Sequence, residues 1–124
     1  MENEKVNNMN ESILNSIKKL LGIGDDYTHF DIDIMTHINS IFVILYQMGV
    51  GTEPFSISSS EATWAVYLDG RYDLVTVKTY IYLRVRLLFD PPASSAAVEA
   101  IKETVRELEF RISVTVDPGP TITG

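Results

Sequence analysis

The acidic segment between residues 24 and 38 holds the side chains best suited to chemistry. It contains four aspartates and two histidines, which are Asp25, Asp26, His29, Asp31, Asp33 and His37. Carboxylate oxygens and imidazole nitrogens are ligands for divalent metal ions. Asp33 and His37 are four residues apart, so on a helix they share one face, as a helical metal site requires. One hypothesis is therefore a small metal-dependent enzyme that uses His29, Asp33 and His37.

A structural role explains the same aspartates without a metal. Asp31 and Asp33 would point to divergent faces near the start of a helix, where carboxylates complement the positive end of the helix dipole. Residues 22–24 (Gly-Ile-Gly) lack the spacing and the preceding strand of a phosphate-binding loop. No serine stands in the context of a nucleophile elbow. The sequence therefore favours the structural role and predicts no catalytic residues, no metal and no cofactor.

Two arginines interrupt an otherwise apolar helical stretch. Residues 77–92 read Val-Lys-Thr-Tyr-Ile-Tyr-Leu-Arg-Val-Arg-Leu-Leu-Phe-Asp-Pro-Pro, and the two prolines stop the helix. A helix that is apolar on nearly every side lies in a core or between subunits, whereas arginines are rarely buried without partners. Arg86 has Asp90 four residues on and is expected to form a local ion pair with it. Arg84 pairs with an acidic residue of either another helix or another subunit.

Four aromatic residues admit both a core and a contact role. Trp64 and Tyr67 are three residues apart on a short expected helix, where they pack onto the bundle or contact a partner. Tyr80 and Tyr82 are expected to pack in the core while their hydroxyl groups reach water.

Glycine, proline and serine residues divide the chain into about five helices, which predicts an all-α fold in a compact bundle. Asn10 is the expected cap of the first helix, and Ser58 followed by Glu61 is a capping-box pattern for the third. The second helix carries an apolar stripe that should face the core, formed by Ile34, Ile38, Ile41, Leu45 and Met48. The expected helices span about residues 11–21, 31–48, 59–68, 73–89 and 95–112.

The end of the chain has a different pattern. Residues 112–116 (Ile-Ser-Val-Thr-Val) alternate apolar and polar side chains as a strand does, and residues 117–120 (Asp-Pro-Gly-Pro) prevent regular structure. The expected organisation is a flexible N-terminus over residues 1–9, a helical domain over 10–112 and an extended C-terminal arm over 113–124.

Composition excludes several classes of protein. The 124 residues carry a net charge of −7 and no cysteine, so there is no disulfide framework and no thiolate zinc site. The scattered lysines and arginines argue against a protein that grips nucleic acid by its phosphates. The first twenty residues lack the apolar core of a signal peptide, and no apolar run is long enough for a membrane span. A soluble protein made in a cytoplasm is expected, and an acidic regulatory binding module is a further hypothesis.

Several segments resemble one protein family. The chain resembles the small helical head–tail connector proteins of tailed bacteriophages, also called adaptor or head-completion proteins. The similarity extends over about residues 10–114, and the segment 77–92 is its most specific part. The other segments that carry it are residues 13–22, 37–40, 45–51, 62–64 and 107–111.

The resemblance implies a structural virion protein that acts at the junction of capsid and tail. Members of this family form a ring, commonly of twelve subunits, beneath the portal protein. The ring extends the DNA channel without binding DNA specifically and offers a docking surface to a tail or stopper protein. Assembly in the cytoplasm of the bacterial host and no contact with a membrane are expected. The expected subunit or portal contacts are Trp64, Tyr67, Arg84, Arg86, Ile112, Val114 and Val116.

Overall fold

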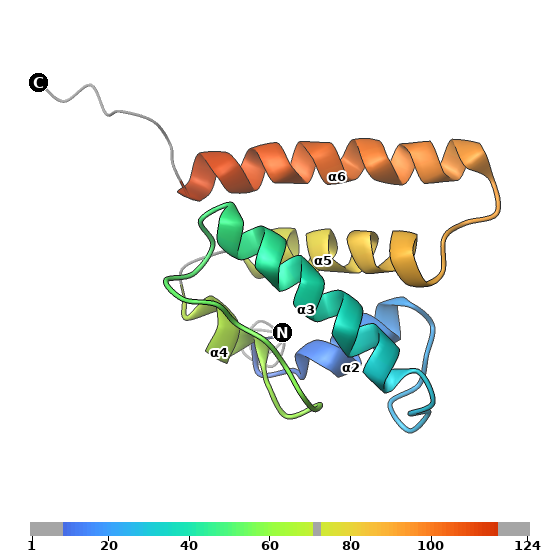
Figure 1. Ribbon diagram of the computed structural model, residues 1–124, viewed down its shortest axis with the longest axis horizontal. Coiled ribbons are helices and arrows are strands. Elements are labelled where there is room, and N and C mark those ends of the chain that lie inside the picture. The colour runs from blue at the N-terminus through green and yellow to red at the C-terminus, as the bar shows by residue number, and fades with distance from the viewer. Residues whose placement is uncertain (1–8, 71–72, 117–124) are drawn as a thin grey trace, which may run out of the picture.

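The computed structural model describes residues 9–70 and 73–116 and confirms the predicted all-α fold (Figure 1). The helices are α2 (Ile13–Leu20), α3 (Asp31–Gln47), α4 (Trp64–Leu68), α5 (Leu74–Phe89) and α6 (Ser95–Val116). Helix α5 is central, because α3 crosses it, α6 runs back along its length, and α2 contacts both α3 and α5. The long helix α6 therefore lies at the edge of the bundle, with α5 as its main support.

The core forms where the apolar stripes of these helices meet. The predicted stripe of α3 is confirmed for Ile34, Ile38, Ile41 and Leu45, which have no exposed surface, whereas Met48 follows the helix and is only partly buried. Helix α5 adds four further buried side chains, those of Val77, Tyr80, Ile81 and Val85. Burying one large apolar side chain contributes about 1.5–3 kcal/mol. The combined burial explains how a chain without disulfides holds a defined fold.

Polar side chains fix where three of the helices begin. The Oγ atom of Ser12, not the side chain of the expected Asn10, accepts the N–H of Asn15 at 3.1 Å and caps α2. Asp73 caps α5 by accepting the N–H of Thr76 at 2.9 Å. Ser94 caps α6, because its Oγ atom accepts the N–H of Ala97 at 3.3 Å. Both later helices thus begin close to their predicted positions.

The third predicted helix is shorter than expected. The capping-box prediction is wrong, because the Oγ atom of Ser59 accepts the N–H of Glu61 at 3.1 Å in a turn that does not continue as a helix. An antiparallel bridge between Ser12 and Thr63 keeps the backbone extended beyond this turn. Thr63 then caps α4, which begins at Trp64. A contact between distant segments overrides the local signal.

The strand-like prediction for residues 112–116 is also wrong, since α6 continues to Val116. Ile112 and Val116 are four residues apart and share one helix face, and Ile112 is only 3% exposed. A methyl group of Val116 occupies the space that a Cβ atom would take at Gly49, whose φ is +99°. Burial on this face outweighs the few tenths of a kcal/mol by which β-branched residues disfavour a helix. The rest of the expected arm, residues 117–124, lies outside the described residues.

The predicted flexible N-terminus needs one correction. Met9, its last residue, packs against the hydrophobic core. Residues 1–8 lie outside the described residues.

Candidate functional site

A polar cluster joins α5 to α6. The Nη1 atom of Arg84 lies 2.7 Å from Oε2 of Glu109 and donates a second hydrogen bond to the Tyr80 hydroxyl at 3.0 Å. The Tyr80 hydroxyl donates in turn to Oε2 of Glu109 at 2.8 Å, so it does not depend on water as expected. The sequence left two kinds of partner possible for Arg84, and the structure shows it paired with an acidic residue of another helix, Glu109. The cluster fixes α6 on α5 through a charge-assisted hydrogen bond, which typically contributes about 1.5–3 kcal/mol.

This cluster predicts a loss of stability at high pH. Burial, together with the hydrogen bond to Glu109, raises the pKa of Tyr80 to about 12. An unfolded tyrosine loses its proton near pH 10, so between pH 10 and 12 the unfolded state binds fewer protons than the folded state, and stability falls as pH rises. We expect the wild-type chain to lose about 2 to 3 kcal/mol more than Tyr80→Phe over this range. Urea unfolding between pH 8 and 12 measures the difference, and parallel curves would contradict it.

Arg86 does not form its predicted ion pair with Asp90. Its Nη1 atom instead donates to the Tyr82 hydroxyl at 3.2 Å. Asp90 has left the helix (φ −149°, ψ 68°), so its side chain no longer lies above that of Arg86. The Nε atom of Arg86 is buried and has no hydrogen-bond partner among the described residues. Arg86 is therefore a cation for which the described part of the chain provides no acidic partner.

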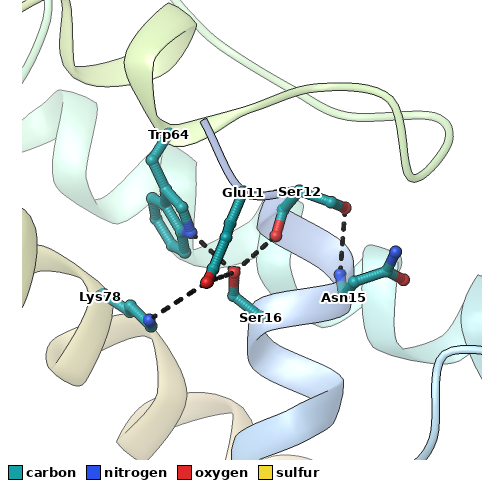
Figure 2. Close-up of polar contacts among 6 residues, drawn as sticks. All are labelled: Glu11, Ser12, Asn15, Ser16, Trp64 and Lys78. Carbon is teal, nitrogen blue, oxygen red and sulfur yellow. Dashed lines mark hydrogen bonds and ion pairs between the residues drawn. The ribbon is translucent and has the colours of Figure 1, made fainter. Parts of the chain in front are cut away.

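Trp64 packs in the core, which is one of the two roles considered for it. Its side chain has no exposed surface, and its indole N–H donates to Oγ of Ser16 at 3.0 Å. Figure 2 shows this contact together with Glu11, whose carboxylate lies beside Ser16 and 4.0 Å from Nζ of Lys78. Trp64 thus links α4 to α2 within one subunit and has no exposed surface for a partner to contact.

Tyr67 also packs within the subunit. The centroid of its ring lies 4.5 Å from that of Phe42 and 4.8 Å from that of Phe55. This aromatic group attaches the short helix α4 and the preceding loop to α3.

The three expected contact residues near the end of α6 differ in exposure. Ile112 is buried and Val116 rests on Gly49, so both stabilise the position of α6. Val114 is 45% exposed and points away from the bundle. Among these three, Val114 is the residue available to another molecule.

The acidic segment does not assemble a metal site. The His29 ring packs edge-on against the Phe30 ring, with 4.7 Å between their centroids. The centroid of the His37 ring lies 6.4 Å from that of the Phe89 ring. In residues 9–70 and 73–116, no group of three or more potential ligand side chains is placed to hold a metal ion. Asp31 and Asp33 both lie in the first turn of α3, as their predicted role in complementing the helix dipole requires.

A groove that the sequence does not predict lies between α5 and α6. Its volume is about 310 Å³, and its lining combines apolar and charged side chains. The lining residues are Arg84, Leu87, Leu88, Lys102, Val105, Arg106 and Glu109. The sequence alone does not place Lys102 and Arg106 beside α5.

Several large apolar side chains also lie on the surface outside any predicted contact. Ile32, Val66, Val75 and Phe110 are each more than 60% exposed. Phe110 is five residues after the buried Val105 and two before the buried Ile112, and these spacings put it on another face of α6.

Comparison with known proteins identifies a family for this chain. A family model described as "phage connector protein" matches residues 13–119 of the 124. The search of curated proteins and the search of solved structures gave no match. None of the helices in the described residues has the length and hydropathy needed to cross a membrane. Because the match spans all the helices described above, the chain belongs to the phage connector protein family.

Proposed function

We propose that this chain is a structural subunit of a phage head–tail connector. In this proposal a dodecameric ring forms beneath the portal protein, extends the DNA channel and offers a docking surface to a tail or stopper protein. The subunits are made and assembled in the host cytoplasm and remain in the virion at the capsid–tail junction. The observation that carries the proposal is the family match over residues 13–119.

The surface of the subunit is compatible with a ring. A closed ring uses heterologous contacts, in which one patch meets a different patch on the next subunit. Exposed apolar side chains on several helices, such as Ile32 on α3 and Phe110 on α6, provide material for such patches. A net charge of −7 is compatible with a channel through which DNA moves without binding to the protein.

The proposed contact residues follow from exposure and charge. Val114 is exposed, and Arg86 has no acidic partner among the described residues, so both remain candidates for subunit or portal contacts. Arg84 pairs with Glu109 but also lines the groove between α5 and α6, so it is a further candidate for a subunit or portal contact. Trp64, Tyr67 and Ile112 support these surfaces from inside the subunit.

Deletion of the gene from its phage or prophage tests the proposed function. We expect tailless heads that have lost their DNA, together with unattached tails, because the capsid lacks its docking surface. Electron microscopy of the particles measures this, and a plasmid copy of the gene should restore tailed virions. Normal tailed virions from the deletion strain would overturn the proposal.

The C-terminal segment is proposed to act as an assembly arm. A chain that ends at Val116 should keep its thermal unfolding temperature, because Ile112 and Val116 remain in place. Its affinity for the portal protein should fall about tenfold or more, which corresponds to at least about 1.4 kcal/mol. Portal binding by the full-length and shortened chains measures the effect. Equal affinities would show that residues 117–124 are not an arm.

A further inference from the structure

The groove between α5 and α6 has an unusual charge for this acidic chain. Its lining carries three cations, Arg84, Lys102 and Arg106, but only one anion, Glu109. Between these charges lie Leu87, Leu88 and Val105, and Leu88 is 56% exposed. A volume of about 310 Å³ is at the lower end of the range for ligand pockets. The groove is thus shaped and charged to receive an acidic segment that carries an apolar side chain.

Two of the cations that line the groove form only exposed ion pairs within their own subunit. Lys102 pairs with Glu99 at 3.7 Å and Arg106 pairs with Glu103 at 3.0 Å, each one helical turn away within α6. Their side chains are 49% and 57% exposed in these pairs. Exposed pairs of this kind contribute little, about 0.2–1 kcal/mol, so both cations can turn to a stronger partner at small cost.

The loop between α2 and α3 has the complementary chemistry. Residues 24–28 carry Asp25 and Asp26 without any lysine or arginine, and the next residue, Tyr27, is 52% exposed. Both aspartates are exposed as well. The loop therefore presents two negative charges beside an aromatic ring.

The loop is held in place before any partner arrives. The N–H of Tyr27 donates to the carbonyl oxygen of Gly24 at 3.1 Å, and the buried Nζ of Lys18 donates to the carbonyl oxygen of Asp25 at 3.2 Å. The Tyr27 ring also rests against Phe30, with 5.9 Å between centroids. A segment that is already ordered loses little conformational entropy when it binds.

From this complementarity we infer that the groove between α5 and α6 receives the loop 24–28 of the neighbouring copy of this chain. The Tyr27 ring covers Leu88 in the groove, and the two aspartates face Lys102 and Arg106. No residue of the loop lines the groove of its own subunit, which leaves the groove open to the loop of another copy. Loop and groove are different patches, and their repetition forms a ring when the rotation closes. The inference rests on the ring proposed above and names the contact within it.

Disulfide cross-linking tests this contact directly, because the chain contains no cysteine. Thr28→Cys and Leu88→Cys are introduced into one chain, which leaves both aspartates and Tyr27 unchanged. Oxidation of plasmid-rescued particles should give a ladder of multimers on a non-reducing gel. The matched control pairs Thr28→Cys with Val66→Cys, at a position on α4 that is 67% exposed, and should remain monomeric. A monomer only, or a ladder that stops at the dimer, would overturn the inference.

Charge reversal separates a specific contact from accidental proximity. In the cross-linking chain, Asp25→Lys with Asp26→Lys should reduce the multimers about tenfold or more, because four cations then face one another. Adding Lys102→Glu and Arg106→Glu should restore the ladder, and failure to restore it would count against the contact. Thermal unfolding of each variant confirms that it folds. If the gene is required for tailed virions but no ladder forms, the inference alone fails, whereas normal virions without the gene remove the proposed function.

Discussion

Trp64→Ala is expected to lower the free energy of unfolding by about 3–5 kcal/mol, the usual cost of removing a large buried aromatic side chain. Trp64 has no exposed surface, and its indole N–H donates to Oγ of Ser16 at 3.0 Å. The substitution therefore leaves a cavity between α4 and α2 and removes a buried hydrogen bond. Urea denaturation followed by circular dichroism measures the change.

Two further variants divide this effect into its parts. Trp64→Phe keeps most of the apolar volume but removes the N–H donor, and Ser16→Ala removes the acceptor. Each should cost about 1–3 kcal/mol, less than the full truncation. A cost for Trp64→Ala below about 1 kcal/mol would show that the side chain is not packed in the core as described.

Asp31→Ala is expected to destabilise the chain by about 3–5 kcal/mol, because it leaves a buried ammonium group without its counter-ion. The Lys18 side chain has no exposed surface, and its Nζ lies 2.8 Å from Oδ1 of Asp31. The carbonyl oxygen of Asp25 at 3.2 Å remains as a neutral partner. Equilibrium denaturation at neutral pH measures the loss.

Two controls distinguish the ion pair from other roles of Asp31. Asp33→Ala removes an exposed carboxylate from the same first turn of α3 and should cost only about 0.3–1 kcal/mol, the helix-dipole contribution. Lys18→Met combined with Asp31→Ala removes both charges and should cost less than Asp31→Ala alone, because no buried charge is left without a partner. Equal losses for Asp31→Ala and Asp33→Ala would contradict the buried ion pair.

The features that the sequence predicts well depend on near neighbours. The core stripe of α3 follows from the spacing of Ile34, Ile38 and Ile41, and the end of α5 follows from the two prolines after Asp90. Such signals act within one or two turns of a helix, so no other part of the chain needs to be known. The family resemblance rests on the same segments and is confirmed by the match over residues 13–119.

The failures arise where distant segments meet. Because of the bridge between Ser12 and Thr63, α4 begins only at Trp64. The contact between Gly49 and Val116 keeps the end of α6 helical. Lys18 looks like an ordinary solvated lysine in the sequence, although the fold buries it against Asp31. Local propensities amount to a few tenths of a kcal/mol per residue, whereas burial of one large side chain contributes several times more.

The candidate site is harder to predict for the same reason. Arg84 is recognisable as an arginine that needs a partner, but its spacing cannot select Glu109 from among the other acidic residues. The groove exists only because α6 runs back along α5 and brings Lys102 and Arg106 beside Leu88. A surface built from two helices has no signature in either one alone.

The two attachments of α6 also restrict how this protein can vary in length. Glu109 is held by Arg84, and Val116, about two helical turns further on, fills the space left by Gly49. One inserted or deleted residue between them would rotate the end of the helix by about 100° and separate Val116 from Gly49. Among related connectors that keep both attachments, this interval should therefore be constant, and length changes should accumulate in the loop before α6 instead.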